Sequence, residues 1–139
     1  MSQEMDPNPM GDLILKWKRK IVVKELALLH DKELKQLVSM SNNLLQFDML
    51  KLIQEERIGP GPEHVKLILR LITARLTNQA NRRNYVQRNL ALLEDNDLQD
   101  LVDASGGLLN LKILQRIKSG DLKPANTMIN IIVAMFDFL

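Results

Sequence analysis

Apolar residues recur at the spacing of an α-helix along almost the whole chain. In the first such stretch, from Asp12 to Leu29, they fall within one broad arc of a helical wheel, formed by Leu15, Trp17, Ile21, Val22, Leu26, Leu28 and Leu29. Trp17 lies on this apolar face, so we expect it to anchor a core rather than to stack on a ligand. No stretch alternates apolar and polar residues with the period of two that is typical of strands. The pattern predicts an all-α protein.

The same spacing predicts a short helix over Asp31–Ser39, with Asp31 as its cap, and a third helix over Asn43–Glu56. Gly59-Pro60-Gly61-Pro62 is the clearest break in the chain, and Pro62 suits the start of a helix over Glu63–Leu76. The second half repeats this layout, with helices over Gln79–Leu93, from Asp95, from Leu108 after Gly106-Gly107, and from the break at Lys123–Asn126 to Phe136 or beyond. The side chains expected to be buried in the first half are Leu34, Leu37, Val38, Leu44, Leu45, Met49, Leu50, Leu52, Ile53, Val65, Ile68, Leu69 and Ile72.

A repeat with a spacing of 64 residues relates the two halves. The segment Glu25–Gln54 aligns with Asn89–Lys118 without a gap, and thirteen of the thirty aligned positions are identical. Leucine supplies eight of these identities, and the others are Ala27/Ala91, Asp31/Asp95, Val38/Val102, Ser41/Ser105 and Ile53/Ile117. The same register also aligns Arg19/Arg83, Val22/Val86 and Pro60/Pro124. We interpret this pattern as an internal duplication.

A single unit of 64 residues buries too little surface to offset the conformational entropy of its chain. Two copies packed face to face would share one core, and no Gly/Ser-rich linker separates them. We therefore expect residues 1–11 to form a flexible tail and residues 12–139 to form a single domain. The predicted fold is a compact bundle of about eight helices, built from two pseudo-symmetric repeats over about 12–76 and 77–139.

The composition excludes several classes of protein. The 139 residues include no cysteine, which excludes a disulfide scaffold, a thiol nucleophile and a cysteine-based metal site. The chain has only two histidines, which excludes a histidine-rich metal centre. The N-terminus lacks the basic start and apolar run of a secretory signal. The most apolar tract, Ile129–Leu139, is shorter than the roughly 20 residues that cross a bilayer. We expect an intracellular protein, cytoplasmic or nuclear, with no cofactor and no membrane partner.

Sequence motifs of catalysis are also missing. The Gly59–Pro62 stretch lacks the lysine and the Ser/Thr of a phosphate-binding loop, and no HExxH, EF-hand or Gly-x-Ser-x-Gly pattern occurs. His30 and His64 each stand next to an acid near a helix start, where surface or capping roles are typical. We expect a protein that is not an enzyme.

Two charged surfaces are candidates for binding. The acidic candidate set contains Glu94, Asp95, Asp97, Asp100 and Asp103. Weak binding of a divalent metal is one interpretation of this set, and a solvated helix start favoured by the helix dipole is the other. In the first half Gln36 and Ser39 take the places of two of these acids, which argues against a metal site used by both halves.

The basic candidate set contains Lys16, Lys18, Arg19, Lys20, Lys24, Arg82, Arg83 and Arg88. The first five belong to the first helix, where Lys18 intrudes on the apolar arc, and the last three to the corresponding helix of the second half. If the pseudo-symmetry holds, both groups could line one basic surface that neutralises the phosphates of an RNA or DNA backbone. The alternative is a solvated helix face, which is common in a chain with 26% charged residues.

Protein–protein interaction is the leading functional interpretation, because a small helical bundle without a catalytic motif works through its surface. The exposed candidates are the Gly59–Pro62 loop, the acidic candidate set and the basic first helix. Acidic and basic faces on one body also permit head-to-tail self-association into a homo-oligomer. Binding of a nucleic-acid backbone is the alternative function.

The order of these signals resembles the death-fold superfamily, the caspase-recruitment and death-effector domains. The residues that carry the resemblance are Asp31-x-x-Leu34-x-x-Leu37-Val38, Leu44-Leu45, Leu50, Ile53 and Val65 to Leu76, with Asp95–Phe136 in the duplicate. Those domains normally have six helices, whereas each repeat here has room for about four, and the Arg-x-Asp-Leu motif of the death-effector type does not occur. The resemblance implies homotypic binding through charged helix faces in signalling or its subversion.

Overall fold

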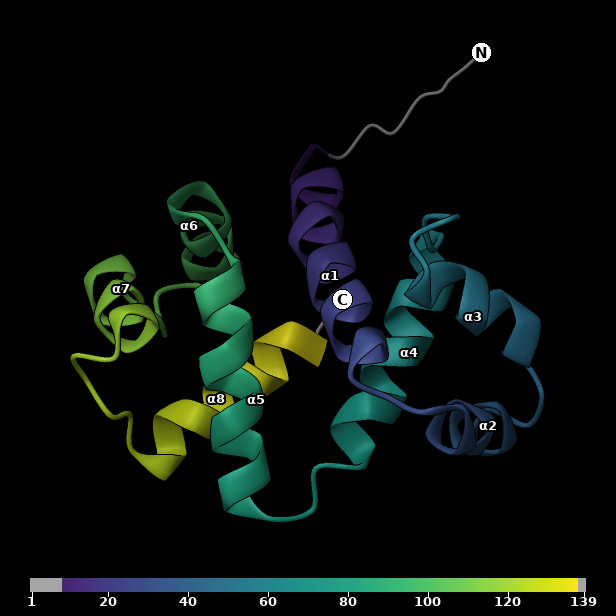
Figure 1. The fold of residues 1–139 in the computed structure, drawn as a ribbon. Helices are drawn as coiled ribbons and strands as arrows, with labels where there is room; N and C mark the ends of the chain where they lie inside the picture. Colours follow the sequence, from purple (N-terminus) through teal and green to yellow (C-terminus); the bar gives the residue numbers. More distant parts are fainter. Residues whose placement is uncertain (1–8, 138–139) are drawn as a thin grey trace.

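The computed structural model describes residues 9–137, and the side chains of residues 15–137. Within this range the chain forms eight α-helices and no strand, which confirms the all-α prediction (Figure 1). The helices are α1 (Pro9–Ala27), α2 (Asp31–Met40), α3 (Phe47–Gln54), α4 (Pro62–Ala74), α5 (Gln79–Leu92), α6 (Asp95–Ala104), α7 (Leu111–Ser119) and α8 (Asn126–Asp137). The first eight residues of the predicted tail lie outside the described residues. The other three belong to α1, whose first residue is a proline, as suits a position that needs no N–H donor.

Helix α1 runs through the middle of the molecule, with α2–α4 on one side and α5–α7 on the other (Figure 1). It packs against α3 and α4 and also against α5 and α6, so it joins the two halves of the chain. Helices α1 and α5 run in opposite directions, and α8 packs against both α5 and α4. The arrangement makes α1 the helix around which the others are organised.

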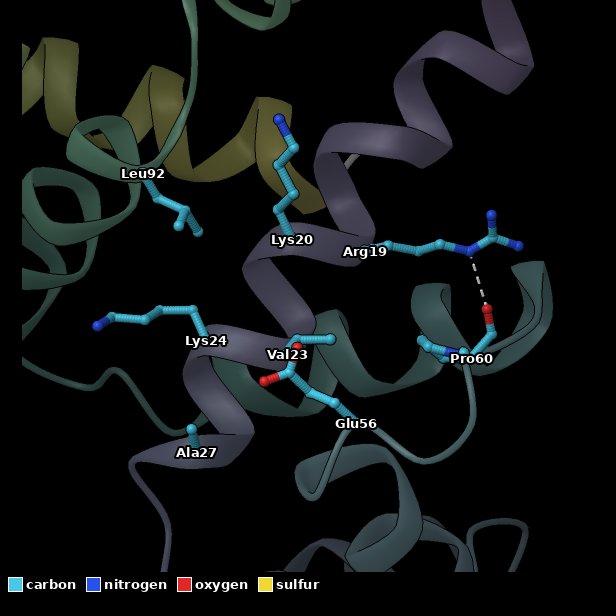
Figure 2. A pocket seen from close by; sticks show the side chains of 9 residues that line it. Arg19, Lys20, Val23, Lys24, Ala27, Glu56, Pro60 and Leu92 are labelled. Carbon is cyan, nitrogen blue, oxygen red and sulfur yellow. Dashed lines mark hydrogen bonds between the residues drawn. The ribbon is translucent and has the colours of Figure 1, made fainter.

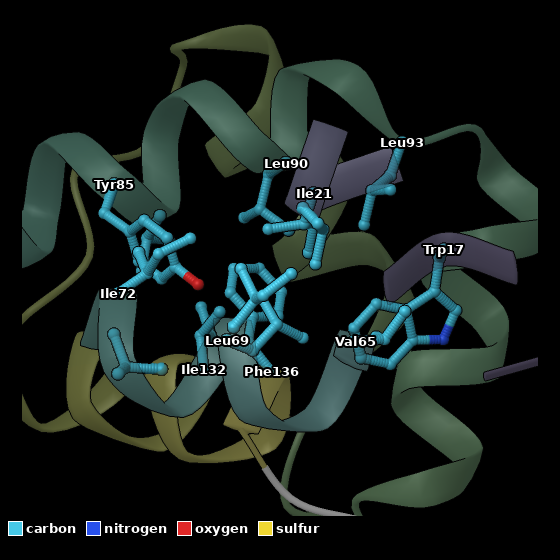
Figure 3. Close-up of a cluster of buried hydrophobic side chains, with 14 of the residues drawn as sticks. Trp17, Ile21, Val65, Leu69, Ile72, Tyr85, Leu90, Leu93, Ile132 and Phe136 are labelled. Carbon is cyan, nitrogen blue, oxygen red and sulfur yellow. The ribbon is translucent and has the colours of Figure 1, made fainter. Parts of the chain in front are cut away.

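One continuous cluster of buried apolar side chains draws on all eight helices of the described chain. At its centre the Phe136 ring lies between Trp17 and Tyr85, with centroid distances of 5.8 Å and 5.7 Å (Figure 3). Pairs of aromatic rings in such tilted and edge-on arrangements stabilise a fold by about 0.5–1.5 kcal/mol beyond the burial of their surface. Trp17 is fully buried, as predicted, and it connects the first helix to the last.

Two helices begin later than predicted, α3 at Phe47 instead of Asn43 and α7 at Leu111 instead of Leu108. The reason is a left-handed turn before each helix. Asn42 and Asn43 have φ angles of 55° and 66°, and Gly106 and Gly107 have 62° and 95°. A helix cannot run through residues in this conformation, which glycine adopts freely and asparagine tolerates best among the other residues.

These turns expose two leucines. Leu44, which the periodicity predicted to be buried, is 71% exposed, and Leu108 is 64% exposed. The leucine that follows each of them, Leu45 or Leu109, is buried. The prediction for Leu44 was wrong because it extended helical spacing through a turn that is not helical. Leu28 belongs to the apolar arc predicted for the first helix, yet it is 49% exposed, since α1 ends one residue before it.

A serine holds each of these turns by the same hydrogen bond. The Ser41 hydroxyl accepts from the backbone N–H of Leu45 at 3.0 Å, and the Ser105 hydroxyl accepts from the N–H of Leu109 at 3.0 Å. Both hydroxyls also donate to a backbone carbonyl three residues earlier. The bonds satisfy a buried donor that the turn leaves without a helical partner.

The first turns of α2 and α6 are also held alike. The Glu33 carboxylate accepts from the N–H of His30, and the Asp97 carboxylate accepts from the N–H of Glu94. His30 and Glu94 are therefore the capping residues of α2 and α6. This confirms a capping role for His30, and the cap of α2 lies one residue before Asp31, where it was predicted. Such reciprocal contacts satisfy N–H groups that the first helical turn leaves free.

Candidate functional site

An open groove of about 510 Å³ runs along one face of α1 (Figure 2). Val23 and Ala27 supply its apolar surface on α1, which we call the floor. The connection between α3 and α4 supplies one wall, with Glu56, Gly59 and Pro60, and Leu92 at the end of α5 supplies the other. Arg19, Lys20 and Lys24 of α1 complete the lining. The volume lies in the range of about 300–1,000 Å³ that is typical of ligand-binding clefts.

The spacing of residues on α1 explains this face. Lys20, Val23, Lys24 and Ala27 stand at i, i+3, i+4 and i+7, so they follow one another along the same side of the helix. This side points away from the core residues Ile21 and Val22, which are fully buried. An apolar stripe bordered by lysines therefore remains at the surface.

A hydrogen bond fixes the Pro60 wall to α1. The Arg19 guanidinium donates through Nε to the Pro60 carbonyl at 3.0 Å, the bond drawn in Figure 2. Pro60 is buried, so its carbonyl needs a donor from the protein, and Arg19 provides it. Arg83 donates in the same way to the carbonyl of the buried Pro124. Arg19 thus has a structural role in addition to its place in the groove.

The groove has an excess of positive charge. Lys20 forms an ion pair with Asp97 at 2.6 Å, and Arg19 has committed one of its five N–H donors to Pro60. Lys24 is exposed and makes no hydrogen bond or ion pair with any described residue. Glu56 is the one acid in the lining. Asp97 therefore neutralises Lys20, whereas Arg19 and Lys24 have no acidic partner among the described residues and can attract an outside acceptor.

Lys18 does not belong to this surface. The structure places it inside, with 2% exposure, beside the Trp17 ring. Burial lowers the pKa of Lys18 to about 8, the nearby Asp137 carboxylate opposes that change, and the positive charges of Lys66 and Arg70 add to it. Lys18 intrudes on the apolar arc of α1, as the sequence indicates. It is therefore a buried ammonium with a lowered pKa and not a surface cation.

The three arginines of α5 are engaged in contacts within the protein. Arg82 donates to Asn130 and to the Leu76 carbonyl, and Arg83 donates to Asn126 as well as to Pro124. Arg88 forms a two-bonded ion pair with Glu25, with both distances 2.7 Å. None of the three lines the groove on α1. Because α1 and α5 are antiparallel, the first half of α5 lies toward the opposite end of α1 from Lys16 (Figure 1).

Part of the acidic candidate set faces part of the basic candidate set inside the molecule. Asp97 is 1% exposed and accepts from Lys20. Burial opposes its ionisation, but the hydrogen bonds from Lys20 and from the Glu94 N–H, with the charge of Lys16, outweigh burial and hold its pKa below the ordinary value. The pKa of Asp100 is raised by partial burial and by the neighbouring carboxylates of Asp97 and Asp103.

The remaining acids point outward. Glu94, Asp95 and Asp103 are exposed, and Asp103 accepts a hydrogen bond from Gln99 at 2.8 Å. Over the described residues, no three Asp, Glu or His side chains converge on a point where a metal ion could sit. The acidic candidate set is thus divided between an internal contact of Asp97 with α1, a solvated start of α6 at Glu94 and Asp95, and a solvated end of α6 at Asp103.

Sequence reasoning identified the cations and the Gly59–Pro62 loop but missed Val23, Ala27, Glu56 and Leu92. Val23 and Ala27 carried a signal, because they are apolar residues on the same side of α1 as Lys20 and Lys24. Glu56 and Leu92 carried none, since they reach α1 only through the tertiary structure.

In the part of the chain that the structure describes, no helix combines the length and apolar character needed to cross a bilayer. Comparison of the chain with protein-family models, with curated proteins and with solved structures gives no match. What the chain does must therefore be inferred from its own geometry.

Proposed function

We propose that this chain is a non-enzymatic protein–protein interaction module, which binds its partner in the groove along α1. The observation that carries the proposal is that one open site combines an apolar floor with positive charge that no described acid neutralises. Burial of the apolar surface of Val23 and Ala27 by a partner is favourable, and the charge of Lys24 favours a partner that carries acidic groups. The resemblance to death-fold domains fits this proposal, because those domains also act through charged helix faces.

The geometry favours a protein partner over a nucleic-acid backbone. Binding of phosphates requires a set of exposed cations that release counterions together. Of the basic candidate set, Lys18 is buried, Arg82, Arg83 and Arg88 are engaged away from the groove, and Lys20 is paired with Asp97. Lys16, Arg19 and Lys24 are left, and Arg19 and Lys24 border an apolar surface that phosphates do not need.

We also infer that the chain consists of two copies of one four-helix unit. Several recurrences at a spacing of 64 residues support this inference. Helices α2 and α6 have bounds that differ by this spacing, as do the serine-held turns, the two left-handed pairs and the Arg–Pro carbonyl bonds. The contacts depart from the symmetry of two copies at one place. Helix α1 packs against α6, but the corresponding pair, α5 and α2, is not among the helix pairs in extensive contact.

Divergence between the two copies explains why the groove belongs to the first. At the positions of Val23 and Lys24 the second copy has Gln87 and Arg88. The Gln87 amide donates to the Ile117 carbonyl at 2.5 Å, and Arg88 pairs with Glu25. The equivalent face of α5 is thus occupied by internal contacts, and the proposed function needs only the face of α1.

Site-specific photo-crosslinking tests the proposal. A photoreactive amino acid at Ala27, in the groove, should capture a discrete protein partner in the native cell, and the same label at the exposed Gln99 of α6 should not. Leu92→Asp should abolish the adduct, and nuclease treatment should leave it intact. Equal labelling from both positions, or loss of the adduct with nuclease, would contradict a protein-binding groove.

A further inference from the structure

We propose, resting on the function proposed above, that the groove takes an acidic amphipathic helix with one apolar stripe and carboxylates on both sides of it. The groove presents positive charge and apolar surface in a fixed order across α1. Cations stand near each wall, apolar side chains form the floor between them, and no hydrogen-bonding strand edge is offered.

The cations lie on both sides of the apolar floor. In Figure 2, Lys24 extends to the side of α1 on which Leu92 lies, and Arg19 extends toward the side of Pro60. Lys20 points between these two directions and is paired with Asp97. The Nε of Arg19 is bound to Pro60, which leaves its two terminal NH₂ groups for a carboxylate. A ligand with an acidic group on only one flank would use half of this arrangement. An apolar stripe with acids on both flanks uses all of it.

The partner's backbone must satisfy its own hydrogen bonds. A peptide that binds in extended form needs an unpaired strand edge, and the described residues contain no strand. A polyproline segment needs aromatic side chains to dock on, and none lines this groove. A helix satisfies its backbone internally and presents side chains alone, which is what the groove can receive.

The length of the groove sets the size of the helix. Arg19 to Ala27 spans eight residue steps on α1, or about 12 Å at the usual helical rise. A partner helix of two to three turns covers this length, with apolar residues at i, i+3 and i+4 against Val23, Ala27 and Leu92. Leu92 is 37% exposed, so it has apolar surface left for such a contact.

The single acid of the lining gives the inference its sharpest test. Glu56 repels an acidic ligand, whereas Lys24 attracts it, and both side chains are exposed and so can be changed without disturbing the core. Lys24→Glu should therefore weaken binding, and Glu56→Lys should strengthen it. Opposite effects from two charge changes at one site would not arise from a loss of folding.

The probe is a fluorescein-labelled designed helix of about 14 residues, with leucines on one face and glutamates on both flanks. Its controls are a scrambled peptide of the same composition, a peptide with lysines in place of the glutamates, and a single-stranded RNA oligonucleotide. Of these probes, we expect only the designed helix to bind the full chain. The backbone amide signals of the chain whose chemical shifts change on binding should map to the α1 groove face, Gly59 and Leu92. Lys24→Glu should weaken binding about tenfold, Glu56→Lys should tighten it, and Lys112→Glu outside the groove should change nothing.

The outcomes separate the partner's chemistry from the proposed function. If the designed helix binds no better than its scrambled or basic controls, while crosslinking at Ala27 still depends on Leu92, the groove binds a protein of other chemistry and this inference is wrong. If the RNA alone binds and Lys24→Glu abolishes that binding, both proposals fail. Identical affinities of Lys24→Glu and Glu56→Lys for the designed helix would also overturn the inference.

Discussion

The Asn89 side chain donates a hydrogen bond to Glu25, the residue 64 positions earlier in the chain, at a distance of 2.8 Å. The two positions correspond in the sequence repeat, and they meet where α1 crosses α5. Contact between corresponding positions is expected where a twofold relation between two copies would have its axis. Glu25 also accepts both hydrogen bonds of Arg88, so one nearly buried carboxylate is the polar junction of the two halves.

We predict that Glu25 and Arg88 are energetically coupled. Glu25→Ala should lower the free energy of unfolding by about 1–3 kcal/mol, because it leaves the Arg88 guanidinium without its acceptor and the buried Asn89 amide with the Tyr85 carbonyl alone. The partial exposure of Arg88 keeps the effect below that of a fully buried pair. Urea denaturation of both single variants and the double variant should give a coupling energy of about 1 kcal/mol or more. Strictly additive effects would show that the pair contributes little.

The repeated serine bonds should contribute equally. Ser41→Ala and Ser105→Ala each leave a buried backbone N–H, of Leu45 or Leu109, without an acceptor. Each change should therefore cost about 1–2 kcal/mol of unfolding free energy. Ser39→Ala is a matched control because Ser39 is exposed, and its effect should stay within about 0.5 kcal/mol. A large cost at one serine and none at the other would argue against equivalent turns.

Substitutions at Gly107 should report the backbone strain of the α6–α7 turn. This glycine has a φ of 95°, and a side chain added there would meet nothing within 4 Å, so any cost comes from the backbone conformation. We expect Gly107→Val to destabilise the protein by about 1–2 kcal/mol and Gly107→Asn to cost less, because asparagine tolerates positive φ. Asn43, at the corresponding place, shows that the residue type is accepted there. Thermal denaturation measures the difference, and equal costs for both variants would contradict this explanation.

Because of Asp97, the free energy of unfolding should depend on pH in the acid range. Its pKa in the folded protein lies below the unfolded value of about 3.9, so the unfolded chain binds its proton first as the pH falls. Its contribution is fully present above the unfolded pKa and is lost as the pH falls through the folded pKa. Asp97→Asn should thus destabilise the protein at pH 7 by about 1–3 kcal/mol, and the difference from the wild type should shrink toward pH 2. A difference that is constant over this range would show that the charge of Asp97 is unimportant.

The helices and most of the core were predictable from the sequence because helix periodicity is a local property. Val65, Ile68, Leu69 and Ile72 are buried as their spacing indicates, and every predicted helix exists. Prediction failed at Leu44, where two asparagines in the left-handed conformation replaced the expected helix start. Glycine at the corresponding positions of the second half was recognisable as a turn signal, whereas asparagine was read as part of a helix.

The order of residues along the chain was enough to establish which side of each helix is apolar, where the chain turns, and that its two halves share a pattern. It did not determine which polar sides are covered, because that depends on helices that arrive from elsewhere in the chain. Lys18 and Asp97 are buried, Lys20 is paired with Asp97 of α6, and Lys24 has no ion pair with any residue that the structure describes. The groove likewise required the tertiary structure, since it forms only where α1, the α3–α4 connection and Leu92 come together.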